Sequence, residues 1–129
     1  MHIEHIALWT NDIERMRSFY ETCFGAFAGN MYSNESTGFQ SYFLTFPSGA
    51  RLEIMRSPVT ENPEGEPRPA TAGYAHIAFS LGSEERVDTL TQRLSDAGHL
   101  VIDGPRSTGD GYYESVVLDP DGNRVEITV

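Results

Sequence analysis

The chain contains Gly122-Asn123-Arg124-Val125-Glu126-Ile127 close to its end, and Gly49-Ala50-Arg51-Leu52-Glu53-Ile54 follows the same pattern 73 residues earlier. Further toward the N-terminus, His5-Ile6-Ala7 returns as His76-Ile77-Ala78 after 71 residues. The two halves of the chain therefore follow one pattern, and the repeat includes polar residues as well as apolar ones. The repeated polar residues with the strongest chemistry are His5, Glu53, His76 and Glu126.

Length and composition favour one domain made of two half-domains. A chain of 129 residues with 39% hydrophobic content can form one compact core but is short for two unrelated domains. Cys23 has no second cysteine to pair with, and the first residues lack the basic and then apolar run of a signal peptide. We therefore expect a protein of the reducing cytoplasm.

Charge and hydropathy exclude two classes of partner. The formal net charge is −10, and all nine basic residues are arginines, so a nucleic-acid-binding surface is not expected. No segment approaches the roughly 20 consecutive apolar residues that cross a bilayer.

Periodicity and turn residues predict the same order of elements in both halves. For the first half we expect a helix after Asn11 or Asp12 that ends near Gly25, and strands at residues 2–9, near 27–33, at 39–47 and at 50–56. For the second half we expect a helix over 83–97 and strands at 74–81, near 99–102, at 112–118 and at 123–129. Residues 104–111 are expected to form a polar turn, with a flexible lid as the alternative. The modules are residues 1–57 and 73–129, joined by a proline-rich linker over 57–72.

Strand alternation predicts which way the repeated polar residues point. Successive side chains of a strand lie on opposite faces, so Leu52 and Ile54 share one face and Glu53 lies on the other. The same alternation applies to the other three strands, and it places the four polar residues on the faces opposite the helices. An ordinary solvated strand face is the competing interpretation for any one of these residues, but it explains the duplicated set poorly.

Two imidazoles and two carboxylates form a suitable donor set for a divalent metal. Nitrogen and oxygen ligands without thiolate suit Zn²⁺, Ni²⁺ or Co²⁺, as well as Mn²⁺ or Fe²⁺, and a closed structural zinc site usually contains cysteines. We therefore predict an open metal site with His5, Glu53, His76 and Glu126 as ligands. Such a metal can polarise a carbonyl group and stabilise an enediolate.

The same motifs resemble the vicinal oxygen chelate superfamily, which contains glyoxalase I, extradiol dioxygenases, fosfomycin-resistance enzymes and bleomycin-binding proteins. The resemblance rests on His5-Ile-Ala-Leu with Asn11-Asp12 and Phe19-Tyr20, on Gly73–Ser80, and on Asp119-Pro-Asp-Gly-Asn-Arg-Val-Glu126. It implies an α+β fold in which paired βαβββ modules form curled mixed sheets around a metal cleft, as one domain over residues 1–129.

The resemblance also implies an activity. The order His, Glu, His, Glu is similar to bacterial glyoxalase I, which isomerises the hemithioacetal of a small 2-oxo compound through an enediolate. In that scheme Glu126 is the favoured base and Glu53 the second. Dioxygenases use a His, His, Glu triad, here His5, His76 and Glu126, so a dioxygenase or another metal-dependent lyase is an alternative. A binder of the bleomycin-resistance type that carries no metal is a further one.

The substrate side departs from glyoxalase I. That enzyme typically holds the glutathione carboxylates with an arginine four residues after the first ligand and an asparagine four after the second, and this chain has Trp9 and Ser57 there. We expect a substrate pocket lined by Trp9, Phe46, Met55 and Tyr74. The glyoxalase I arrangement also implies a homodimer in which His5 and Glu53 of one chain meet His76 and Glu126 of the other.

Overall fold

A computed structural model describes residues 4–58, 74, 76–109 and 111–129. These residues fall into two compact units, whose boundary lies between the modules expected from the repeat. The predicted linker falls almost entirely outside the described residues.

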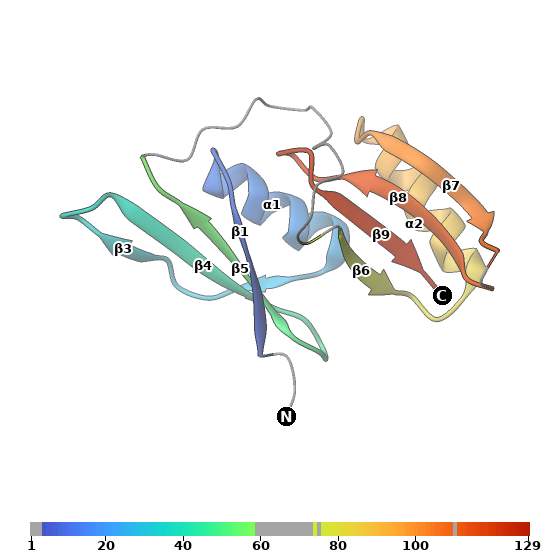
Figure 1. The fold of residues 1–129 in the computed structure, drawn as a ribbon, viewed down its shortest axis with the longest axis horizontal. Coiled ribbons are helices and arrows are strands. Elements are labelled where there is room, and N and C mark those ends of the chain that lie inside the picture. The colour runs from blue at the N-terminus through green and yellow to red at the C-terminus, as the bar shows by residue number, and fades with distance from the viewer. Residues whose placement is uncertain (1–3, 59–73, 75, 110) are drawn as a thin grey trace. The chain divides into compact units, whose positions relative to one another are not determined.

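The first unit has one helix and a mixed sheet (Figure 1). β1 pairs with β5 in parallel, β5 pairs antiparallel with β4, and both β2 and β3 pair with β4. The unit thus follows the predicted order, with the expected strand near 27–33 divided into two short pieces. Its elements are β1 (His5–Trp9), α1 (Ile13–Phe24), β2 (Phe27–Ala28), β3 (Tyr32–Asn34), β4 (Phe39–Thr45) and β5 (Arg51–Arg56).

Both ends of α1 have the capping residues that the sequence predicted. The Asp12 side chain accepts a hydrogen bond from the Arg15 amide at 3.0 Å, which satisfies one of the free N–H groups of the first turn. Gly25 ends the helix with φ 66°, a left-handed conformation that favours glycine. The buried stripe of the helix packs against the sheet and consists of Ile13, Met16, Phe19 and Tyr20.

The second unit repeats this plan with a four-stranded sheet in the order β6-β9-β8-β7 (Figure 1). β6 pairs with β9 in parallel, as β1 does with β5, and the remaining pairs are antiparallel. Its helix buries Val87, Leu90, Thr91 and Leu94. The elements are β6 (His76–Ser80), α2 (Glu84–Asp96), β7 (Val101–Ser107), β8 (Tyr113–Leu118) and β9 (Arg124–Thr128).

A buried carboxylate shapes the turn between β8 and β9. Asp119 is 4% exposed, and its Oδ1 accepts hydrogen bonds from the backbone amides of Asp121 and Asn123 at 3.0 and 2.9 Å. Its Oδ2 accepts a third from the Asn123 side chain at 2.8 Å. Gly122 adopts a positive φ of 78° in the same turn. The Asp-Pro-Asp-Gly-Asn motif therefore forms a turn that is stabilised by its own internal hydrogen bonds, and this turn positions β9 beside β8.

The polar turn expected at 104–111 is shorter than the sequence predicted. β7 continues through Ser107, with irregular pairing to β8 around Asp103 and a cis peptide before Pro105. A Cβ on Gly104 would lie 2.4 Å from the carbonyl oxygen of Glu114, so only glycine lets the strands approach this closely. Glycine and proline here allow an irregular edge strand, whereas by sequence they indicated its end.

The predicted faces are confirmed within each unit. Leu52 and Ile54 are 3% and 0% exposed, and Val125 and Ile127 are fully buried beneath the helices. The residues that alternate with them stay partly open to solvent. The two helices and two mixed sheets confirm the α+β class, and none of the helices in the described part of the chain is long and apolar enough to span a membrane.

Candidate metal site

The first His–Glu pair lies on neighbouring parallel strands of the first unit. The register places Ala7 beside Glu53 and His5 beside Arg51, so His5 and Glu53 are diagonal neighbours on the face opposite α1. His5 Nε2 lies 3.9 Å from Glu53 Oε2, and the two side chains are 40% and 16% exposed. Both donor groups are therefore accessible from the open face of the sheet.

The second pair has the same register in the second unit. Ala78 lies beside Glu126 and His76 beside Arg124, and His76 Nδ1 is 3.2 Å from Glu126 Oε1. The exposures of 42% and 20% are close to those of the first pair. The repeat seen in the sequence is thus also a repeat of strand register, and each sheet presents one imidazole and one carboxylate on its open face.

The donor spacing of the second pair fits a shared ion. Two donors that each lie about 2.1 Å from one ion, at the angles of octahedral or tetrahedral coordination, are roughly 3.0 to 3.4 Å apart. The second pair falls in this range and the first is slightly wider. The structure brings the four predicted ligands together two by two: no group of three or more His, Cys, Asp or Glu gathers among the residues it describes. The full set of four remains a prediction.

His5 is held from its other side. Its Nδ1 hydrogen-bonds to Glu4 Oε2, and the second oxygen of Glu4 pairs with Arg51, whose guanidinium lies 4.1 Å from the centre of the Phe43 ring. Phe43 also meets the His5 ring edge-on at 5.3 Å. The hydrogen bond from His5 and the Arg51 guanidinium hold the pKa of Glu4 below its usual range. The Glu4 carboxylate thus occupies the Nδ1 side of the His5 ring, and Nε2 is the nitrogen that faces Glu53.

The four predicted pocket residues are placed unequally. Trp9 and Met55 are paired in register on the open face of the first sheet. Phe46 follows β4 and is half-buried, and Tyr74 precedes β6 and is 99% exposed. Their part in a pocket therefore stays a prediction.

Sequence reasoning missed Glu4, Phe43 and the clamp that Arg51 forms between them. Phe43 is the register partner of Glu53 and stands on the open face, but the pairing of β4 with β5 was needed to recognise this. Glu4 carried a signal that could have been used, because an acid next to a ligand histidine can orient its ring.

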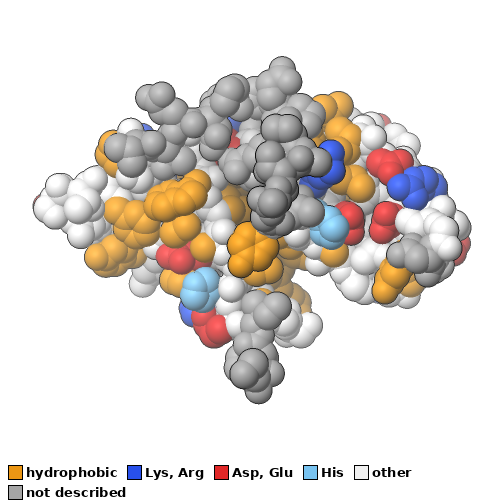
Figure 2. All heavy atoms as spheres, viewed as in Figure 1, with side chains coloured by type: hydrophobic (Ala, Val, Ile, Leu, Met, Phe, Trp, Pro, Cys, Tyr) orange, Lys and Arg blue, Asp and Glu red, His pale blue; other side chains and the backbone are white. Residues whose placement is uncertain are grey.

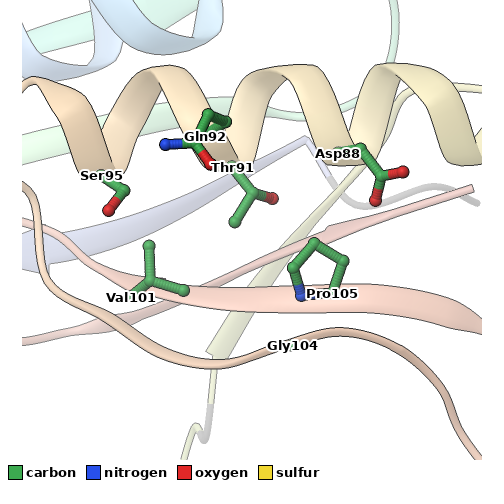
Figure 3. A pocket seen from close by; sticks show the side chains of 7 residues that line it. All are labelled: Asp88, Thr91, Gln92, Ser95, Val101, Gly104 and Pro105. Atoms are coloured by element: carbon green, nitrogen blue, oxygen red, sulfur yellow. The ribbon is translucent and has the colours of Figure 1, made fainter.

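A separate groove of about 340 Å³ lies in the second unit between α2 and β7 (Figure 3). Its polar lining includes Asp88, which accepts a hydrogen bond from the Tyr113 hydroxyl at 2.7 Å. Because α2 covers the face opposite His76 and Glu126, this groove is not continuous with the pair.

Comparison with known proteins identifies the family. A family model described as the Glyoxalase/Bleomycin resistance protein/Dioxygenase superfamily matches residues 2–127. The chain belongs to this superfamily. The match spans both units, in agreement with the duplicated pattern, and confirms the resemblance drawn from the motifs.

Individual relatives of this superfamily member differ in what their names say. The uncharacterized protein PA2024 of Pseudomonas aeruginosa is 32% identical, over 98% of this chain and 86% of its own length. Metallothiol transferase FosB of Lysinibacillus sphaericus is 26% identical, over 96% of this chain and 79% of its own. A glyoxalase I mutant from Zea mays matches 98% of this chain with 44% of its own, at a TM-score of 0.80 and 18% identity, which shows a shared fold.

Proposed function

We propose that this superfamily member is a metal-dependent isomerase of the glyoxalase I type, which acts on a small 2-oxo compound or its thiol hemithioacetal. The observation that carries the proposal is the duplicated His–Glu pair, with the same strand register in both units. If these residues were only part of a solvent-exposed strand face, an imidazole and a carboxylate would not be expected at the same register in both units. We assign His5, Glu53, His76 and Glu126 as ligands of one divalent ion, with Zn²⁺, Ni²⁺ or Co²⁺ before Fe²⁺ or Mn²⁺.

The metal would polarise the substrate carbonyl and make the adjacent C–H bond more acidic. The chain's own part is the movement of one proton. A Glu126 carboxylate oxygen takes the proton from the carbon of the hemithioacetal that bears the hydroxyl group, and the electrons of that C–H bond form the enediolate. The same oxygen returns the proton to the neighbouring carbon, and the hydroxyl proton passes to the former carbonyl oxygen. Glu53 is the second candidate for this role, because its carboxylate is the equivalent group of the other unit.

The glutamate of the first pair favours this reaction over the dioxygenase alternative. A triad of two histidines and one glutamate would need only Glu126, yet Glu53 has the same strand register as Glu126 and lies 3.9 Å from His5. Metallothiol transferase FosB, whose name states a metal-linked thiol chemistry, is a relative along nearly the whole chain. That similarity supports a metal and leaves the identity of the thiol to experiment.

The proposal is tested by metal analysis of protein purified without added metal, followed by turnover of methylglyoxal with and without glutathione. We expect about one divalent metal ion for every two His–Glu pairs, which is one ion per chain. Turnover should stop when a chelator is added. Protein that retains no metal after incubation with Zn²⁺, Ni²⁺ and Co²⁺ in turn would refute the assignment. If the protein binds metal but turns over methylglyoxal neither with nor without glutathione, the metal-site assignment would stand and the proposed isomerase reaction would be rejected.

Glu4 should matter although it is not an assigned ligand. Because its carboxylate holds His5 Nδ1–H and leaves Nε2 for the metal, Glu4→Gln should weaken metal retention about tenfold or more. Chelator competition measures the affinity, and ¹⁵N-detected NMR of the metal-free protein shows whether His5 has lost its Nδ1–H form. Glu35→Gln, at an exposed turn position, is the matched control. Equal metal affinity in both variants would contradict the orienting role.

A further inference from the structure

The open face of the first sheet continues past the His5–Glu53 pair as a line of apolar side chains. The registers pair Trp9 with Met55, Met55 with Ser41, and Ser41 with Tyr32, so these residues form one row across four strands. The row stands two residues further along β1 and β5 than Ala7 and Glu53, a step of about 7 Å. We call Trp9, Met55, Tyr32 and the adjacent Phe39 the aromatic row.

The rings of the aromatic row touch one another and remain open to solvent. Phe39 meets Trp9 edge-on, with ring centres 6.1 Å apart, and meets Tyr32 at the same separation. Even so, Trp9 is 43% and Tyr32 57% exposed. Figure 2 shows hydrophobic side chains gathered over β3, β4 and β5, beside a histidine and acidic side chains. A ligand held near His5 and Glu53 would have this preassembled apolar surface next to it.

The second unit has the opposite chemistry at the equivalent place. Ser80 lies four residues after His76, as Trp9 lies four residues after His5. The register partner of Ser80 is Thr128, and the register partner of Thr128 on β8 is Glu114. Beyond Glu114 the row ends at Arg106. The repeat has therefore kept the His–Glu row in both units and changed the row beside it. If the fold required aromatic residues in this row, both units would have them. The aromatic row therefore reflects a requirement that is specific to the first unit.

Among the residues that the structure describes, the aromatic row contains no cation that could bind a carboxylate of glutathione. Arg56, the nearest basic residue along β5, pairs in register with Gln40 and so lies on the other face from Met55. Its side chain donates to the Asn11 carbonyl at 3.2 Å and to Gln40 Oε1 at 3.3 Å. The surface next to the first pair is thus built for an apolar group.

We propose that the aromatic row binds an apolar substituent of the substrate, a branched aliphatic or aryl group attached to the 2-oxo unit. This inference rests on the proposed function, since the His5–Glu53 pair must hold the oxo end of the molecule. The step of about 7 Å between the rows places the aromatic row within reach of a substituent on an oxo group held at the His5–Glu53 pair. The preferred substrates are then larger and more apolar than methylglyoxal.

The test compares two 2-oxo acids that share the chelating end and differ in the substituent: 4-methyl-2-oxopentanoate and pyruvate. Calorimetric titration of the Zn²⁺-loaded protein should show at least tenfold tighter binding of the longer acid, because each buried methylene contributes about fourfold. Trp9 is the only tryptophan of the chain, so its fluorescence should change with 4-methyl-2-oxopentanoate at the concentrations that the titration reports.

Variants locate the preference. Trp9→Ser gives the first unit the side chain that Ser80 provides in the second, and it should reduce the affinity ratio to about threefold or less. Tyr112→Ala removes an aromatic ring of similar exposure (56%) from the second unit and should leave the ratio unchanged. A second variant in the row, Tyr32→Ser, should lower the ratio by a smaller factor.

Three outcomes would overturn the inference. Equal affinity for the two acids in protein that retains metal removes the apolar subsite and leaves the proposed function standing. An unchanged ratio in both Trp9→Ser and Tyr32→Ser does the same. If Trp9→Ser shifts the monomer–dimer equilibrium while neither affinity changes, a second copy of the chain covers the row. Failure to retain metal, in contrast, refutes the proposed function and with it the inference.

Discussion

Glu53→Gln is expected to lower metal affinity by at least about 100-fold and to abolish isomerase turnover. Loss of a residue that only orients a ligand typically costs about 10- to 100-fold, and Glu53 is proposed to bind the metal directly through a carboxylate 3.9 Å from His5 Nε2. The neutral amide keeps the size of the side chain but removes the charge that binds a cation. Chelator competition and steady-state turnover measure the two effects.

The comparison with Glu126→Gln makes the result diagnostic. In the isomerase interpretation both variants lose metal and activity, because each glutamate completes a His–Glu pair. In a three-ligand dioxygenase only Glu126→Gln would do so, and Glu53→Gln would keep near-normal metal content. Glu85→Gln, on the exposed surface of α2, controls for loss of a negative charge. Wild-type behaviour of Glu53→Gln would therefore reject the isomerase in favour of the dioxygenase.

Removal of the metal should lower the melting temperature and dissociate a homodimer. If ligands from two chains bind one ion, the ion stabilises only the assembled form, by about 4 kcal/mol at a free concentration 1,000 times its Kd. For a chain of this size that corresponds to a fall of roughly 15 °C when a chelator is added. Differential scanning calorimetry and sedimentation at micromolar concentration follow the two changes.

His76→Ala serves as the matched variant for the dimer, because it removes one proposed ligand from an exposed position. Its melting temperature should no longer respond to the chelator. A metal-loaded wild-type monomer would contradict the shared site, and the four ligands would then have to come from a single chain. A dimer that persists unchanged without metal would show that the metal is not part of its interface.

The directions of the side chains could be predicted from the sequence because alternation along a strand is a local property. Leu52 and Ile54 had to lie opposite Glu53 wherever β5 was placed in the sheet. The cap at Asp12 and the left-handed residue at Gly25 were equally local, and both are confirmed. A reader of the sequence could therefore place each His–Glu pair on an open face before knowing the topology.

Contacts that depend on pairing between distant strands could not be predicted in this way. Phe43 stands beside Glu53, and Tyr32 in the row of Trp9, only because β4 pairs with both β5 and β3 in one particular register. The extension of β7 was missed for a different reason. Gly104 and Pro105 usually end a strand, and here an irregular edge strand accommodates them.

The buried Asp119 has a consequence for the second pair, although it lies seven residues from Glu126. Sliding β9 by one residue against β8 would turn Glu126 inward and expose Val125 and Ile127. Such a slip would move Asn123, whose backbone amide and side chain both donate to the buried Asp119 carboxylate, and would weaken these hydrogen bonds where solvent cannot replace them. Asp119 therefore stabilises the register of β9 against β8, and in this way it helps to keep the side chain of Glu126, a proposed metal ligand, on the open face of the sheet.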